Sequence, residues 1–290
     1  MAGLFQVFFW ITQDNRVSLI ETSFEKVESL SYSPFEGYDK KVLSPEQIEE
    51  DVSMLSHFTT KLRTYSTADA KVILEATSKT DIPIDLGLWI SGDHKENHLE
   101  IQRALKLLEK YPDNIANVIV GNETLLRADL EEEELFAYID FVAEFTNKPI
   151  TCAETWDVWE RIPDLAKHVD FITIHILPYW EKVPIDRFND FIIEKYTLVE
   201  KLFPYTKINI GETGWPSHGY NNNNAVPSLK NQAVAIRGFI NLASEKGWDY
   251  NIVEAFDQQW KGYDEGNVGQ YWGIFTSDRE LKFYLSGDIE

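Results

Sequence analysis

Short apolar runs recur along the chain, and each is followed by a polar turn and then by an amphipathic stretch. Eight of these runs have the length and the β-branched or aromatic content of strands. We expect strands at residues 27–33, 61–66, 84–90, 117–122, 149–155, 169–177, 207–213 and 251–257. Strands that alternate with helices predict a parallel sheet, and eight such units predict closure into a single (β/α)8 TIM barrel of the α/β class.

The stretches between the predicted strands carry helix signals. Ser44, Pro45 and Gln47 have the arrangement of an N-cap, a first helical proline and the third residue of a capping box. The acidic run at 131–134 indicates a helix N-terminus, which favours negative charge, rather than a metal site. Ser228 is predicted to cap a further helix.

The length of 290 residues suits one barrel, and no proline-, glycine- or serine-rich linker divides the chain. We expect a catalytic barrel over residues 27–290 and an N-terminal extension over residues 1–26. The extension contains an apolar run at 4–11, which is too short to span a bilayer and lacks the features of a signal peptide. It fits either a packed element or the trimmed end of a longer, membrane-linked chain.

The charge balance narrows the range of partners. The chain has 48 acidic and 27 basic residues, a formal net charge of −21, which repels phosphate backbones, so nucleic acid is not an expected partner. The single cysteine, Cys152, excludes an intrachain disulfide and a cysteine-based metal site. Several of the 9 Trp and 13 Tyr residues stand beside Gly, Pro or Asn in predicted loops, where flat rings can stack on the apolar faces of sugars.

Two of the predicted strands end in a glutamate. Glu123 follows the run VIVGN, and Glu212 lies in INIGETGWP. Because the C-terminal ends of barrel strands meet at one rim, where barrel enzymes carry their active sites, we expect both carboxylates at one cleft. Two facing carboxylates are the minimal apparatus for cutting a glycosidic bond, and in retaining enzymes they stand ~5–5.5 Å apart. We therefore predict Glu123 as the general acid/base and Glu212 as the nucleophile.

Further polar and aromatic side chains are predicted at the same rim. Asn122 is placed to donate to a sugar 2-hydroxyl. Arg63 either holds Glu212 ionised or crosses the barrel mouth as a structural residue. The predicted substrate-binding residues are Tyr32, Arg63, Tyr65, Asn122, His175, Tyr179, Trp180, Trp215, Glu254, Trp260 and Lys261.

Several more of these assignments have a structural alternative. Tyr179, Trp180, Trp215 and Trp260 are either sugar platforms or residues of ordinary packing. His175 either bonds near the nucleophile or is a buried histidine with a purely structural partner. Glu254 and Lys261 either position a sugar hydroxyl or pair with each other.

Beyond the seventh strand, residues 221–224 are all asparagine. This run is expected to form a solvated loop over the cleft.

The segments VIVGNETLLR and INIGETGWPSHG resemble the acid/base and nucleophile strands of glycoside hydrolase family 17, the β-1,3-glucanase family. The resemblance covers most of the chain and includes SLSYSPF, KLRTYS, EAFDQQWK and YWGIFTSDRELK. It implies a (β/α)8 barrel, net retention, a β-glucan substrate, no metal and no organic cofactor. By position, Glu123 resembles the proton donor and Glu212 the nucleophile.

The chain departs from the pattern of plant members of this family. His175 and Leu177 stand where plant members have Asn and Tyr, and Gln258 replaces a glutamate. The pattern is closer to bacterial members, which include transglycosylase domains attached to membrane proteins. An exported location (periplasmic, extracellular or membrane-attached) is therefore expected, although a single cysteine also fits the cytoplasm.

The sequence predicts hydrolysis of β-1,3-glucan of the laminarin type by double displacement, in the manner of an endo-β-1,3-glucanase. The alternative is transglycosylation with the same two glutamates, because either water or a sugar hydroxyl can be the acceptor. A non-catalytic glucan-binding barrel is disfavoured because both carboxylates are present. An enzyme of phosphorylated metabolites is rejected, because GETGWP stands where a glycine-rich phosphate loop is expected.

Overall fold

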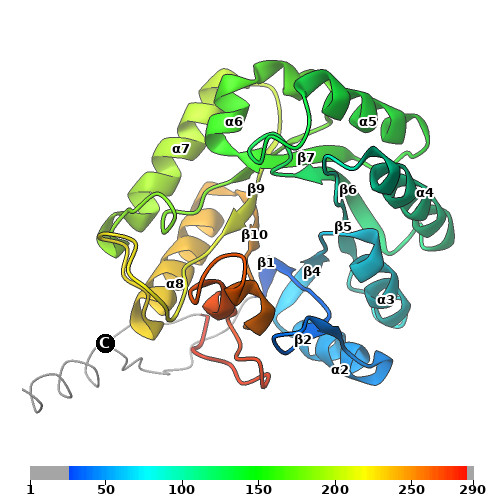
Figure 1. Ribbon diagram of the computed structural model, residues 1–290. Helices are drawn as coiled ribbons and strands as arrows, with labels where there is room; N and C mark the ends of the chain where they lie inside the picture. Colours follow the sequence, from blue (N-terminus) through cyan, green and yellow to red (C-terminus); the bar gives the residue numbers. More distant parts are fainter. Residues whose placement is uncertain (1–25, 286–290) are drawn as a thin grey trace, which may run out of the picture.

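The computed structural model describes residues 26–285. Eight parallel strands close into a barrel in the order β1–β10–β9–β8–β7–β6–β5–β4, and helices surround it (Figure 1). The predicted class, a single (β/α)8 barrel, is confirmed. Since every strand runs parallel to its neighbours, the C-terminal ends of all eight strands lie at the same rim.

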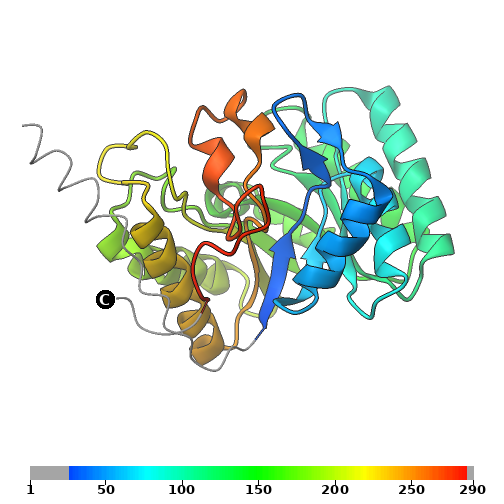
Figure 2. The same ribbon diagram turned by 90° about the horizontal axis from the view of Figure 1, so that it is seen from below.

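Each predicted strand segment contains or overlaps one barrel strand. The strands are β1 (Val27–Ser31), β4 (Thr59–Arg63), β5 (Ile84–Leu88), β6 (Ile115–Asn122), β7 (Ile150–Thr155), β8 (Ile172–His175), β9 (Ile208–Thr213) and β10 (Asp249–Ile252). A short antiparallel hairpin that was not predicted, β2 (Phe35–Glu36) with β3 (Lys41–Val42), follows β1. Figure 2 shows this hairpin and the segment that follows β10 at the same end of the barrel.

The helices follow the strands in alternation. They are α2 (Pro45–Leu55), α3 (Thr67–Thr77), α4 (His94–Lys110), α5 (Glu132–Glu144), α6 (Trp156–Arg161), α7 (Phe188–Leu202) and α8 (Leu229–Lys246). Ser228 caps α8 as predicted, since its hydroxyl accepts the backbone N–H of Asn231 at 3.0 Å.

Only half of the predicted capping box forms at the start of α2. The Ser44 hydroxyl accepts the Gln47 N–H at 3.2 Å, but the Gln47 side chain donates to Asp51 instead of returning to the cap. At α5, the backbone N–H of Glu131 donates to the Glu134 carboxylate at 3.0 Å. The acidic run therefore serves the helix N-terminus, as predicted.

The barrel interior is polar below the rim formed by the C-terminal ends of the strands. The Ser29 hydroxyl donates to Asn251 at 2.7 Å, and the Asn251 amide donates to the Ser31 hydroxyl at 2.8 Å and to the Gly211 carbonyl at 3.1 Å. Ser31 in turn bonds the Tyr65 hydroxyl at 2.8 Å. Buried polar groups need partners, and this network connects strands β1, β9 and β10 with the segment that follows β4.

The predicted N-terminal extension lies almost wholly outside the described residues, and so does its apolar run at 4–11. The first barrel strand begins at Val27. Within residues 26–285, no helix has both the length and the apolar character needed to cross a bilayer.

Candidate active site

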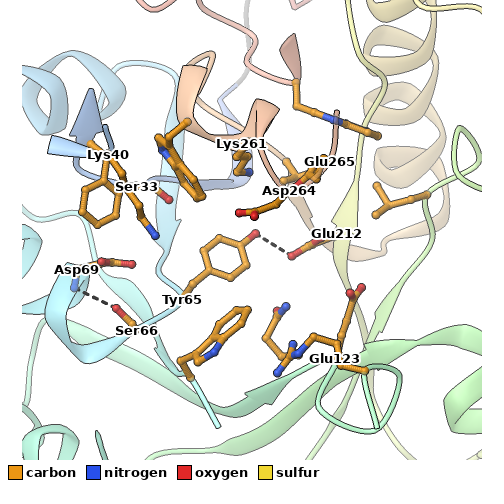
Figure 3. Close-up of a pocket in the computed structure, with 18 of the residues that line it drawn as sticks. Ser33, Lys40, Tyr65, Ser66, Asp69, Glu123, Glu212, Lys261, Asp264 and Glu265 are labelled. Carbon is orange, nitrogen blue, oxygen red and sulfur yellow. Dashed lines mark hydrogen bonds between the residues drawn. The ribbon is translucent and has the colours of Figure 1, made fainter. Parts of the chain in front are cut away.

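A cleft of about 620 Å³ opens at the C-terminal ends of the strands. Figure 3 shows polar side chains from several loops turned into it. Its aromatic lining consists of Phe35, Tyr65, Trp89, Trp180, Trp260 and Trp272. Its carboxylates are Asp69, Glu123, Glu212, Asp264 and Glu265. Flat rings beside carboxylates are the composition that a site for neutral sugar chains needs.

The two predicted catalytic glutamates meet in this cleft. Glu123 directly follows β6 and Glu212 lies in β9. One carboxylate oxygen of each lies within 4.8 Å of the other and of a His175 ring nitrogen. This short gap is close to the separation of ~5–5.5 Å in retaining glycosidases and well below the ~6.5–9.5 Å at which inverting enzymes place an attacking water molecule beside the sugar.

The turn after β6 holds Glu123 in an unusual backbone conformation. Glu123 has a φ of 54°, in the left-handed region that L-residues avoid at a cost of roughly 1–2 kcal/mol. Its N–H donates to the Ala153 carbonyl of β7 at 2.7 Å. Glu154, also on β7, accepts the N–H groups of Leu125 at 2.7 Å and Leu126 at 3.3 Å. Strand β7 therefore fixes the turn that aims the Glu123 side chain.

The surroundings of Glu212 favour its ionised form. Tyr65 donates its hydroxyl to Glu212 Oε1 at 2.8 Å, as drawn in Figure 3, and Arg63 Nη1 lies 3.5 Å from the same oxygen. Burial by itself would raise the pKa of Glu212, but the attraction of the Arg63 guanidinium and the Tyr65 hydrogen bond outweigh it. The pKa of Glu212 therefore lies below its ordinary value, as a nucleophile requires.

His175 lies between the two glutamates. Its Nδ1 is 2.7 Å from Glu123 Oε1, and its Nε2 is 3.2 Å from Arg63 Nη2 and 3.7 Å from Glu212 Oε1. Because a guanidinium only donates, Nε2 accepts from Arg63 and Nδ1 carries the proton toward Glu123. The predicted contact near the nucleophile is present. The side chain is fully buried and does not line the cleft, so the prediction that it binds substrate is wrong.

Glu123, His175 and Glu212 also form a group of metal-ligand type within residues 26–285. The histidine presents different ring nitrogens to the two carboxylates, which does not direct all three ligands at one point. Arg63 contacts Glu212 and His175 at 3.5 and 3.2 Å, so a cation placed there would lie against a guanidinium. The arrangement fits carboxylate chemistry better than metal binding.

Arg63 crosses the barrel mouth from β4 and is almost wholly buried. It donates from Nη2 to Asn122 Oδ1 at 2.7 Å and from Nη1 to the Gly211 carbonyl. Arg63 therefore crosses the barrel mouth as a structural residue and also lies beside the Glu212 carboxylate, so its two predicted roles apply together. Because the Asn122 oxygen accepts from Arg63, its amide nitrogen is the group that can donate toward the cleft, which Asn122 lines.

Glu254 and Lys261 pair with each other, with Nζ 2.9 Å from Oε2. Burial raises the pKa of Glu254 to about 7, against the opposing attraction of Lys261. Lys261 lines the cleft and Glu254 lies behind it. Trp260 also lines the cleft, with the Lys40 ammonium 4.1 Å from its ring centre.

Three predicted sugar-contact residues do not line the cleft. Tyr32 donates its hydroxyl to Asp51 at 2.9 Å, and Tyr179 donates to the Tyr220 carbonyl at 2.6 Å. Trp215 donates its indole N–H to a loop carbonyl at 3.1 Å. All three rings are buried, and the polar end of each has a partner inside the protein. The prediction that these three residues bind substrate is therefore wrong.

Several residues of the cleft were not among the predicted site residues. Trp89 is the last residue but one of the predicted strand 84–90, so its position indicated the rim, and Arg127 lies 4.4 Å from its ring centre. Lys40, Glu265 and Trp272 come from loops that fold back over the mouth. No periodicity in the sequence marks such loop residues.

Comparisons with known proteins agree with this geometry. The model of the BtgE/BtgC glycoside hydrolase domain matches residues 29–273. A glucan 1,3-beta-glucosidase of Schizosaccharomyces pombe is 28% identical over 256 residues, which are 81% of this chain and 79% of that protein. A glycoside hydrolase family 17 beta-1,3-glucanosyltransferase from Rhizomucor miehei has a TM-score of 0.81 at 25% identity, covering 90% of this chain and 98% of its own. An endo-laminarinase from Formosa Hel1_33_131 shares the fold, with a TM-score of 0.77 at 20% identity over 87% and 84% of the two chains.

Proposed function

Because the chain belongs to the BtgE/BtgC glycoside hydrolase domain family, and with its relatives to glycoside hydrolase family 17, we propose that Glu123 and Glu212 catalyse its reaction. The protein is a glycoside hydrolase that cleaves or transfers β-1,3-glucan. The predicted family and enzyme class are thereby confirmed. The resemblance to bacterial members and the exported location stay predictions.

The proposed reaction has two steps. In the first, Glu212 attacks the anomeric carbon while Glu123 gives its proton to the departing glycosidic oxygen, so that a glycosyl ester forms as the glycosidic bond breaks. In the second, Glu123 takes a proton from the acceptor, whose oxygen attacks the same carbon and releases Glu212. Tyr65 and Arg63 stabilise the Glu212 carboxylate before attack and after release.

The observation that carries this proposal is the gap between the two carboxylates. Their oxygens converge to within 4.8 Å, and an inverting enzyme needs ~6.5–9.5 Å to place a water molecule between them. Net retention follows from the shorter gap.

The acceptor decides between hydrolysis and transfer, and we propose hydrolysis with glucan transfer as the second candidate. Transfer is favoured by one observation, namely that the aromatic rings of the cleft come from segments that follow different barrel strands. Rings on more than one side of the glutamates can hold a sugar acceptor as well as the donor chain.

Time-resolved product analysis on laminari-oligosaccharides distinguishes the two outcomes, because products longer than the substrate arise only by transfer. The roles of the glutamates are tested with Glu123→Gln and Glu212→Gln. We expect kcat to fall by at least ~100-fold in each, the usual scale for a lost acid/base group. Glu133→Gln, an exposed substitution on α5, is the control. Full activity of Glu212→Gln would refute the mechanism.

A further inference from the structure

The asparagine run after β9 is only partly a solvated loop. Asn221, Asn223 and Asn224 are exposed, but Asn222 is half-buried. The backbones of Asn222 and Ala225 bond each other in both directions, at 2.9 and 3.0 Å, and close a tight turn. Asn223 in this turn has a φ of 55°, a conformation that asparagine tolerates better than most residues. The turn therefore has a defined shape that orients the Asn222 side chain.

The Asn222 side chain binds the loop that follows β8. Its amide nitrogen donates to the Tyr179 carbonyl at 2.9 Å and to the Trp180 carbonyl at 3.3 Å. A bond in the opposite direction completes the connection, since the Tyr179 hydroxyl donates to the Tyr220 carbonyl at 2.6 Å. The loops after β8 and β9 are therefore joined by three hydrogen bonds in which Asn222 supplies two.

This connection holds the backbone of a residue that lines the cleft. Trp180 is one of the aromatic residues of the cleft, and its ring stacks on Trp272 at 5.9 Å with an interplanar angle of 29°. The preceding residue, Tyr179, is fully buried and packs edge-on against Trp215 and Trp272 at 5.8 Å each. Packing thus anchors Tyr179, while the direct polar contacts of Asn222 fix the peptide groups on either side of the Trp180 backbone.

We propose that Asn222 is a positioning residue that fixes Trp180 as a sugar platform and thereby sets how the enzyme responds to glucan chain length. The inference rests on the proposed function. Without the Asn222 side-chain amide, the carbonyl groups of Tyr179 and Trp180 lose their hydrogen-bond donor. The Trp180 ring then samples more orientations before glucan binds. Binding must then order the ring again, and that cost appears as weaker binding. The chemical step is unaffected, because Asn222 contacts neither Glu123 nor Glu212 in the described structure.

The test is a double-mutant cycle on laminari-oligosaccharides of increasing length, with kcat and KM measured for each. The variants are Asn222→Ala, Trp180→Ala and the two combined. The backbone of Asn222, unlike that of Asn223, does not have a positive φ, so alanine suits it. Asn221→Ala, in the same loop and exposed, is the matched control.

We expect Asn222→Ala to raise KM by roughly 3- to 10-fold, the scale of one or two hydrogen bonds, with kcat within about twofold of wild type. The increase is expected at the same chain lengths at which Trp180→Ala raises KM. The combined variant is expected to match Trp180→Ala, because residues that act through one another do not add. Asn221→Ala is expected to behave as wild type.

Three results would overturn the proposal. They are an unchanged KM in a folded Asn222→Ala, additive effects in the combined variant, and an equal loss of kcat at every chain length together with a lower Tm. If Asn222→Ala does not fold, Asn222→Asp replaces it, since the shape is kept and a carboxylate then faces the two carbonyls. Absence of wild-type activity on every laminari-oligosaccharide would instead contradict the proposed function.

Discussion

Replacement of Tyr65 by phenylalanine isolates the group that keeps the nucleophile ionised. The Tyr65 hydroxyl donates to Glu212 Oε1 at 2.8 Å, and Phe removes only that oxygen. Ser31, which also bonds the hydroxyl, keeps the Asn251 amide at 2.8 Å as a partner. The change therefore acts mainly on Glu212.

The size of the expected change in the pKa of Glu212 depends on the contacts that the carboxylate keeps in the variant. A hydrogen bond to a charged group contributes about 1.5–3 kcal/mol, and one pKa unit corresponds to about 1.36 kcal/mol. Arg63, at 3.5 Å, still stabilises the carboxylate. We therefore expect the pKa of Glu212 to rise by about one unit in the variant, the lower end of that range.

The sign of the change in the pKa of Glu212 decides whether the pH profile of activity moves to higher or lower pH. Glu212 must be ionised to attack, so a higher pKa moves the acid limb of the kcat/KM profile to higher pH by about one unit. The assay is kcat/KM on one laminari-oligosaccharide across the acid range, with Tyr205→Phe, fully exposed in the native protein, as the control. An acid limb that stays in place in Tyr65→Phe would refute the assignment of Glu212 as the ionised nucleophile.

Three further substitutions test the supports of the site. In Gly211→Ala, the new Cβ meets the Thr173 side chain and lies 3.1 Å from Arg63 Nη1, so we expect a loss of about 1–3 kcal/mol in stability and a lower kcat; an unchanged Tm would contradict this. Arg63→Lys is expected to lower kcat more than ~10-fold, because a point charge cannot replace a fork with several partners, and wild-type kcat would contradict it. Burial raises the pKa of Glu154 from 4.5 to about 7, so between these pH values the folded state holds a proton that the unfolded state has lost, and stability falls as pH rises. Glu154→Gln should therefore show a flatter dependence of Tm on pH from 5 to 7, and an unaltered slope would contradict this.

The strands and the catalytic pair could be predicted because both depend on local patterns. Apolar runs mark the strands, and parallel closure brings their C-terminal ends to one rim wherever they stand in the sequence. Glu123 and Glu212 follow from that rule alone. The same rule predicts part of their charged surroundings, because Arg63 and His175 are also the last residues of barrel strands.

The orientation of the rim aromatics could not be predicted. Tyr179 and Trp180 are adjacent in the chain, yet one is buried and the other lines the cleft. The difference comes from distant carbonyl partners, such as that of Tyr220 for the Tyr179 hydroxyl. The backbone of Glu123, at a φ of 54°, is likewise set by contacts with β7 that no local pattern records.

The stereochemistry of the first product tests the central claim most directly. If two carboxylates within 4.8 Å of each other act by double displacement, the sugar released at the earliest times carries the β-configuration at its new anomeric centre. Proton NMR recorded during the first turnovers, before mutarotation, reads this configuration. A β-anomer that later equilibrates is the predicted result, and an α-anomer formed first would contradict the account.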